Sequence, residues 1–162
     1  MKKIIIAFVI FQVLSCSKEK KDNYDKDKII DEISEMFDNY HNDIRNDGLT
    51  AEFKYLDSTK SFFWVPPNYE SALSYDSVKS ILSLNSKSIK TANFSWHKVE
   101  FFPLSEKIAS YSGIVNSEIT DTTDSTATFQ IIESGTVIKR KNDWKILNGQ
   151  SAILPNNIKL KE

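Results

Sequence analysis

The stretch 127-ATFQIIESGTVIKRKNDWKILNGQSAIL-154 decides the fold of this chain. Two β-rich runs flank the polar turn Lys141-Asn142-Asp143, and Trp144 opens the second run. This arrangement predicts a long β-hairpin. A hairpin long enough to cross a whole domain presents an extended apolar face, and other elements of the chain must cover that face.

The segments before this hairpin predict more strands of the same sheet. Two β-rich runs lie at 93–102 and 107–120, and the turn-rich segment 121–125 joins the second of them to the hairpin. A short aromatic run at 61–65 predicts a further strand. The consecutive prolines Pro66 and Pro67 follow it, so this strand must end there or lie at a sheet edge.

Helical patterns fill the first half of the chain. The run 28–46 carries apolar residues at helical spacing, namely Ile29, Ile30, Ile33, Met36, Phe37, Tyr40 and Ile44. Gly48 is a typical helix stop. Shorter helices are predicted at 50–56, with Thr50 as a possible cap, and at 76–84, with Asp76 near the N-cap. Three helices followed by a strand meander predict an α+β domain in which the helices pack on one face of a curved antiparallel sheet.

The first sixteen residues have the pattern of a targeting segment. Lys2 and Lys3 precede the apolar run 4–14, which is too short for a comfortable transmembrane helix of about 20 residues. The run ends at Ser15 and Cys16, the only cysteine of the chain. This segment resembles a bacterial lipoprotein signal. The resemblance implies that Cys16 is lipidated and becomes the first residue of the mature protein.

We therefore expect a signal peptide at 1–15, a charged tether at 16–27, one domain at 28–155 and a tail at 156–162. The expected location is a lipid anchor in the bacterial cell envelope, in the outer membrane and facing the periplasm or the surface. An ordinary secretory signal with a stray cysteine, or a buried free thiol, is the alternative for Cys16.

Composition limits the class of partner. The 162 residues carry 21 basic and 22 acidic side chains. Removing the two lysines of the signal leaves 19 against 22, a formal charge of −3. A mildly acidic chain of mixed charge has no electrostatic footprint for nucleic acid, so we expect no nucleic-acid partner.

The order of these elements resembles the SnoaL-like proteins of the nuclear transport factor 2-like superfamily. The segments that carry the resemblance are Asn46-Asp47-Gly48, Tyr55-Leu56-Asp57, Phe62-Phe63-Trp64, Thr120-Asp121-Thr122 and 135–147. The resemblance implies a cone, with a cavity between the helices and the sheet. Family members use this cavity for isomerases, dehydratases, cyclases or ligand binding, and use the outer sheet for dimerisation. Gln150 stands at a position where the family often has a histidine, and glutamine does not titrate.

Two carboxylates are candidates for proton transfer. Asp57 follows an apolar helix and precedes the aromatic strand, although a turn or cap role is the commoner use of such a residue. Glu133 interrupts an apolar run of a central strand. If Glu133 faces inward it is the carboxylate to test, because buried glutamate is rare without a partner, and if it faces outward it is ordinary surface.

Other residues are candidates for ligand contact. Tyr40, Trp64 and Gln150 are expected to line the cavity, with Tyr69 and Trp96 as further aromatic candidates, although such tyrosines and tryptophans are more often core. His41 lies on the flank of the helical stripe, and His97 alternates with Val99 and Phe101. Neither histidine has a second His or Cys at ligand spacing, so we expect no metal site and no cofactor.

Three functions remain open from the sequence. The first is a lipid-anchored domain that binds a small, partly apolar ligand or a protein partner without catalysis. The second is a cofactor-independent isomerase or lyase with Asp57 or Glu133 as base and Tyr40 as donor. The third uses the sheet as an assembly surface, and a homodimer through the sheet is compatible with all three.

Overall fold

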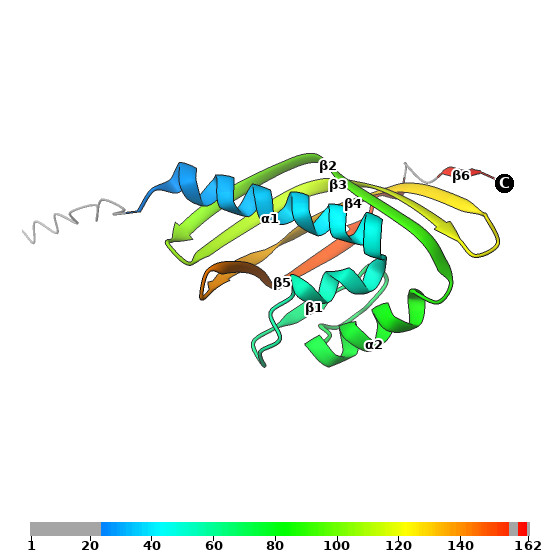
Figure 1. Ribbon diagram of the computed structural model, residues 1–162, viewed down its shortest axis with the longest axis horizontal. Helices are drawn as coiled ribbons and strands as arrows, with labels where there is room; N and C mark the ends of the chain where they lie inside the picture. Colours follow the sequence, from blue (N-terminus) through cyan, green and yellow to red (C-terminus); the bar gives the residue numbers. More distant parts are fainter. Residues whose placement is uncertain (1–23, 156–158, 162) are drawn as a thin grey trace, which may run out of the picture.

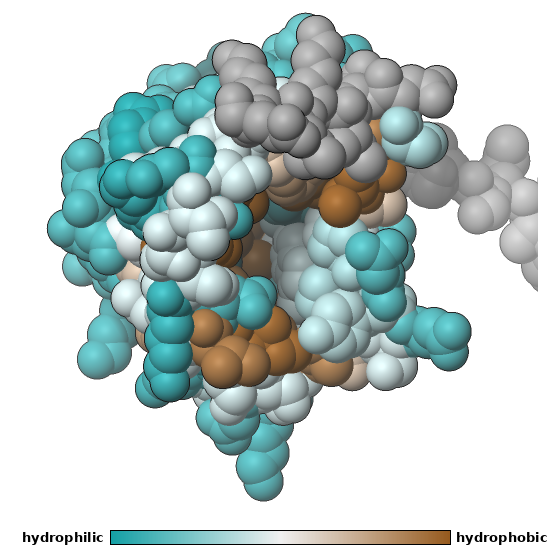
Figure 2. All heavy atoms as spheres, turned by 90° about the vertical axis from the view of Figure 1, so that its right-hand side faces the viewer, coloured by the Kyte–Doolittle hydropathy of each residue, from teal (hydrophilic) through white to brown (hydrophobic). Residues whose placement is uncertain are grey.

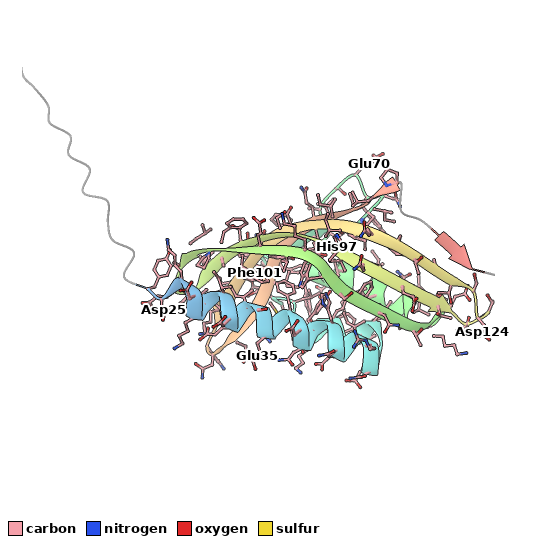
Figure 3. All side chains as sticks on the ribbon, turned by 90° about the horizontal axis from the view of Figure 1, so that it is seen from above. Asp25, Glu35, Glu70, His97, Phe101 and Asp124 are labelled. Carbon is pink, nitrogen blue, oxygen red and sulfur yellow. The ribbon has the colours of Figure 1, made fainter. Side chains whose placement is uncertain are left out.

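The computed structural model of the chain describes residues 24–155 and 159–161. Helices pack on one face of a curved six-stranded sheet (Figure 1). The expected α+β class, with a mostly antiparallel sheet, is confirmed. The start of the first helix and the tip of the hairpin between the third and fourth strands lie at opposite ends of the molecule, marked by Asp25 and Asp124 in Figure 3.

Helix α1 spans Lys26–Asp47 and has identifiable start and stop signals. The Asp25 side chain accepts a hydrogen bond from the Lys28 backbone N–H, and Gly48, at φ +84°, donates its N–H to the Ile44 carbonyl. The buried face comprises Ile29, Ile33, Met36, Phe37, His41 and Ile44. We expected His41 on the flank of this face; instead it is buried with the apolar residues.

The two shorter helices differ in detail from expectation. The predicted second helix is a 3-10 helix, η1, which spans Leu49–Lys54 and begins after Gly48 rather than at Thr50. Helix α2 spans Tyr75–Asn85. Its N-cap is Ser74, whose side chain accepts from the Ser77 N–H, and Asp76 lies in the first turn, near the N-cap as expected.

The sheet has the order β1-β5-β4-β3-β2, with β6 paired to β4 beyond the end of β5. The strands are β1 Phe63–Val65, β2 Ile89–Ser105, β3 Ile108–Asp121, β4 Thr126–Arg140, β5 Asp143–Ile153 and β6 Lys159–Lys161. β1 lies at an edge and pairs in parallel with β5, as its flanking prolines required. β2 starts earlier than the predicted run, and β6 was not predicted.

A β-bulge in β5 decides which of its side chains face the helices. Thr136 of β4 pairs with Asn148, whereas the next residue, Val137, pairs with Ile146, so Leu147 has no partner. The extra residue shifts the alternation of side chains by one position. Ile146 faces the core before the bulge, and Gly149 and Ser151 take the inward positions after it.

Aromatic packing fills one part of the space between α1 and the sheet. The Phe37 ring contacts Trp96, Phe101 and Tyr111, with ring centroids 5.3, 5.8 and 4.8 Å away. The core continues along α1 and the adjoining ends of β3, β4 and β5 through Ile33, Ala109, Val137 and Trp144, all buried. The opposite ends of these strands, together with α2, enclose a cavity.

Candidate functional site

A cavity of about 360 Å³ lies between the helices and the inner face of the sheet. This volume falls within the range of roughly 300–1,000 Å³ typical of small-molecule sites. Figure 2 shows the surface hollowed between hydrophobic residues on the side at the right of Figure 1. The wall is mainly apolar and includes Leu49, Leu56, Phe62, Leu73, Val78, Ile81, Leu82, Ile89, Phe94, Val115, Ile119, Ile131 and Ile146.

Glu133 is a carboxylate in this apolar wall. It lies on β4 opposite Ser151 of β5, and both side chains line the cavity. The neighbouring Ile132 has the opposite orientation and is 44% exposed. The Tyr111 hydroxyl donates to the Glu133 Oε1 atom at 2.8 Å, which orients the carboxyl group. The condition set by the sequence, that Glu133 faces inward, is therefore met.

Gly135 makes the contact between Tyr111 and Glu133 possible. Tyr111 pairs with Gly135 across β3 and β4, and its ring crosses the glycine to reach Glu133. A Cβ atom at position 135 would lie 2.9 Å from Cε1 of Tyr111 and 2.4 Å from the Asn148 carbonyl oxygen. Only glycine leaves the space that the tyrosine ring occupies.

Glu52 is a second carboxylate in the cavity, and sequence reasoning missed it. It lies on η1 and hydrogen-bonds the Tyr40 hydroxyl of α1. A signal was present, because Glu52 follows Leu49 by three residues and precedes Leu56 by four. At helical spacing this places the carboxyl group on the same face as two buried leucines.

The cavity favours the protonated form of both glutamates. Burial raises the pKa of Glu133 to about 7, although the hydrogen bond from Tyr111 opposes this effect. Burial, together with the charge of Glu133, raises the pKa of Glu52 to about 8, against the hydrogen bond from Tyr40. A carboxylate in apolar surroundings loses the hydration that stabilises its charge. The cavity therefore holds two carboxyl groups that titrate near neutral pH.

The aromatic and imidazole groups around these carboxyls are neutral. Burial and the nearby glutamates raise the pKa of Tyr40 and of Tyr111 well above the ordinary tyrosine range. Burial, together with the charge of Arg45, lowers the pKa of His41 to about 4. Neither tyrosine nor the histidine carries a charge at pH 7, so charge in the cavity resides on Glu52 and Glu133.

The expected ligand-contact residues divide between two faces of the sheet. Tyr40, Trp64 and Tyr69 line the cavity. Gln150 does not: it is exposed and lies in a shallow groove on the outer face, beside Phe63 and Ser134. The bulge at Leu147 is the physical reason, because it gives the inward position to the next residue, Ser151. The expected place of Gln150 in the pocket is thus corrected.

Asp57 does not line the cavity, and its carboxylate is held in an ion pair with Arg140. Its side chain is 1% exposed and accepts a hydrogen bond from the Nε atom of Arg140 at 2.5 Å. The Thr59 backbone N–H donates to its other carboxylate oxygen at 2.9 Å. Burial alone would raise the pKa of Asp57, but the bonds from Arg140 and Thr59 outweigh burial and lower it. Asp57 joins the end of η1 to the β4–β5 turn and is not near Glu133.

The remaining candidates lie elsewhere. Trp96 packs against Phe37 in the core and does not line the cavity. His97 is the unpaired residue of a bulge in β2 and is exposed, so it does not share the inward face of Val99 and Phe101 (Figure 3). Cys16, the signal segment and most of the expected tether lie outside the described residues.

The described part of the chain has neither a cluster of metal-ligating side chains nor a membrane-crossing helix. Residues 24–155 and 159–161 contain no group of three or more His, Cys, Asp or Glu side chains placed to hold a metal ion. Within the same residues, no helix has the length and hydropathy needed to cross a membrane.

The fold is that of the nuclear transport factor 2-like (NTF2-like) proteins, as similar solved structures show. A protein from Streptomyces avermitilis, named as a dehydratase of the NTF2-like family, aligns with a TM-score of 0.65 and 9% identity over 79% of this chain and 97% of its own. A protein from Novosphingobium aromaticivorans, named as a scytalone dehydratase, aligns with a TM-score of 0.65 and 14% identity over 78% of this chain and 85% of its own. The hexachlorocyclohexane dehydrochlorinase LinA type 2 aligns with a TM-score of 0.65 and 6% identity over 83% of this chain and 90% of its own.

The structural alignments establish the fold, and at identities of 6–14% they say nothing of the activity of this chain. No protein-family model and no curated protein sequence matches the chain. Function must therefore be argued from the cavity and its residues.

Proposed function

We propose that this domain binds a small, largely apolar ligand in the cavity, without catalysis, and holds a polar group of that ligand at Glu52 and Glu133. The observation that carries the proposal is an apolar cavity of about 360 Å³ with two carboxyl groups in its wall. Apolar walls with a few polar groups that fix orientation are the usual composition of a small-molecule site. The apolar wall supplies affinity by removing hydrocarbon from water, and the carboxyls fix the orientation.

We further propose that the protein carries this domain on a lipid anchor at Cys16, in the bacterial cell envelope. The support is the sequence pattern of a short basic start, an apolar run and a lone cysteine. A lipid anchor would keep the cavity near a membrane, where apolar molecules partition. Each buried methylene adds about 0.8 kcal/mol to membrane affinity, so more than one acyl chain gives stable anchoring.

Ligand binding is tested with the neutral fluorescent probe N-phenyl-1-naphthylamine. We expect saturable one-to-one binding with enhanced probe fluorescence. Ser151→Phe places a ring in the cavity and should abolish the enhancement. Gln150→Phe is the matched control, because the adjacent side chain lies on the outer face. Equal binding by both variants, or no saturable binding by the unaltered protein, would refute the proposal.

A proton-transfer enzyme is the second candidate, and one observation favours it. A carboxyl group whose pKa is about 7, held by a tyrosine hydroxyl, is matched to general base catalysis at neutral pH. Glu133 would take a proton from a carbon acid, and the Tyr40 hydroxyl would turn from Glu52 to donate to the developing negative charge. In this case Glu133→Gln abolishes turnover of an enolisable ketone, and Asp57→Asn retains it. Unchanged turnover in Glu133→Gln would exclude this residue as the base.

A further inference from the structure

The cavity wall contains two acidic side chains and no lysine or arginine among the described residues. The titratable or polar side chains that line the cavity are Tyr40 and His41 from α1, Glu52 from η1, Trp64 from β1, Tyr69 from the segment between β1 and α2, Asn85 from α2, Glu133 from β4 and Ser151 from β5, and Tyr111 of β3 donates to Glu133. Within the described residues, no lysine or arginine lines this cavity. The cavity can become negative by two charges, and no described lysine or arginine lies in its wall to compensate them.

The charges on the two glutamates interact. Ionised Glu133 makes ionisation of Glu52 harder, which is the behaviour of two carboxylates that share a poorly hydrated site. His41 gives no compensation, since it is uncharged above a pH of about 4. Other carboxylates, such as Glu35, Glu70 and Asp124, lie at the periphery of the molecule (Figure 3). The negative charge that lacks a basic partner is therefore that of the cavity glutamates.

The negative charge of the two ionised glutamates distinguishes among anionic, neutral and cationic ligands. When the two glutamates are ionised, a carboxylate or phosphate in the cavity would meet like charge in a site of low dielectric, which costs free energy. A neutral alcohol would accept from or donate to the protonated carboxyls. A cation would pair with both glutamates, and buried charges are tolerated when they are paired and hydrogen-bonded.

The geometry points to an apolar primary amine as the ligand class: we infer that its ammonium group lies between Glu52 and Glu133 and its hydrocarbon part lies against the apolar wall. This inference rests on the proposed function. An ammonium group has three N–H donors and no acceptor. Glu52, Glu133 and the hydroxyl of Ser151, which lies opposite Glu133, supply three acceptors.

The aromatic part of the wall fits the same ligand. Phe62, Trp64 and Phe94 line the cavity and offer ring faces to a cation or to its hydrocarbon chain. Trp64 lies across Gly149, where an added Cβ would be 2.4 Å from the indole ring. The ring is thus held against the sheet.

Amine binding is coupled to proton release. The bound ammonium ion stabilises both carboxylates, so Glu52 and Glu133 release protons when the amine enters. An aliphatic ammonium group has a pKa similar to that of the lysine side chain, about 10, and therefore keeps its proton at pH 8. Tyr40, Tyr111 and His41 remain neutral between pH 6 and pH 8. Amine affinity should therefore rise with pH across this interval, whereas the affinity of a neutral ligand should not.

The test compares 4-phenylbutylamine, 4-phenylbutanol and 4-phenylbutyrate, which share one skeleton. Each compound displaces N-phenyl-1-naphthylamine from the full chain at pH 6 and pH 8. We expect the amine to bind at least about tenfold more tightly than the alcohol at pH 8, the carboxylate to bind most weakly, and the preference for the amine to shrink at pH 6.

Variants at the two glutamates make the test specific. Glu52→Gln with Glu133→Gln should remove the amine preference and keep alcohol binding, and retained alcohol binding shows that the variant is folded. An alcohol that binds as tightly as the amine at both pH values would overturn the amine inference and leave the cavity as an apolar ligand site. Absence of binding by the probe and by all three compounds would overturn the proposed function as well.

Discussion

Glu52 and Glu133 keep protons near neutral pH because the cavity deprives their carboxylates of water. Their pKa values in the folded protein, about 8 and about 7, lie above the ordinary value of 4.5. The folded state therefore binds more protons than the unfolded state between these limits. By linkage, the free energy of unfolding falls as pH rises through this window.

The first prediction uses this slope. His41 opposes it below a pH of about 6.5, because its lowered pKa makes the folded state more stable as pH rises. Between pH 6.5 and pH 8 the glutamates act without that opposition. We expect Glu52→Gln and Glu133→Gln to flatten the decrease in stability over this interval, and to be more stable than the unaltered protein at pH 8 by about 1–3 kcal/mol each. Urea unfolding at several pH values measures the free energy of unfolding. The same pH dependence in the variants and in the unaltered protein would contradict the prediction.

A second prediction concerns Asp57. Replacing it with asparagine removes the charge that pairs with Arg140 while the side chain stays buried. We expect a loss of about 1–3 kcal/mol of unfolding free energy and unchanged probe binding. Asp124→Asn is the control, because its ion pair with Lys90 is exposed and should contribute less than about 0.5 kcal/mol. Loss of probe binding in a folded Asp57→Asn protein would show that this residue serves the site.

At the scale of elements, the inner face of the sheet depends on paired glycines. Gly135 of β4 pairs with Gly149 of β5, and Tyr111 and Trp64 lie across them. Their missing side chains allow two large rings to approach the sheet from neighbouring strands. The arrangement fixes both the donor to Glu133 and an aromatic part of the cavity wall.

A third prediction follows for Gly135→Ala. The added methyl group would meet backbone on one side and the Tyr111 ring on the other, so the tyrosine must move away from Glu133. We expect a loss of stability of about 1–3 kcal/mol. Without the Tyr111 hydroxyl, which lowers the pKa of Glu133, that pKa should rise further. Carbon-13 NMR of the carboxyl group measures the pKa. Ser134→Ala, on the outer face, is the control, and equal pKa values in both variants would contradict the account.

The sequence predicts the long helix and the hairpins, but it does not predict β6 or which side chains of β5 face the helices. Apolar periodicity predicted α1, and turn residues predicted the hairpins, because both signals are local. The bulge at Leu147 has no local signature, so the inward position of Ser151, and with it the exclusion of Gln150, required the pairing with β4. Glu52 was missed because its meaning depends on a distant strand that carries Glu133. The role of Asp57 could not be read from the sequence either, because its partner Arg140 is distant in the chain and meets it only in the fold.

At the scale of the whole molecule, the described chain begins beside the β2–β3 hairpin. The Tyr24 hydroxyl donates to the Pro103 carbonyl oxygen at 3.2 Å, so the first described residue is held at that end of the sheet. The cavity wall includes Ile89 at the start of β2, far along the strand from Pro103. Homodimerisation through the outer face of the sheet stays a prediction.

A fourth prediction tests the proposed anchor. Cys16→Ser removes the thiol that lipidation requires and should move the protein from the membrane fraction to the soluble fraction of a bacterium that processes lipoproteins. Ser17→Ala, next to it, should leave the protein in the membrane fraction. Radiolabelled palmitate should enter only the protein that retains Cys16. A Cys16→Ser protein that stays with the membrane would contradict the anchor and leave the cavity proposal unaffected.

The most direct measurement of the central claim is an NMR titration of isoleucine methyl groups with N-phenyl-1-naphthylamine. Ile131 lines the cavity, and its neighbour Ile132 lies on the outer face of the same strand. The account predicts saturable shifts at Ile131 and Ile119, together with intermolecular contacts to the probe, while Ile132 and the exposed Ile108 stay unmoved. Shifts confined to Ile132 and Ile108, or no saturable shift at Ile131, would contradict it.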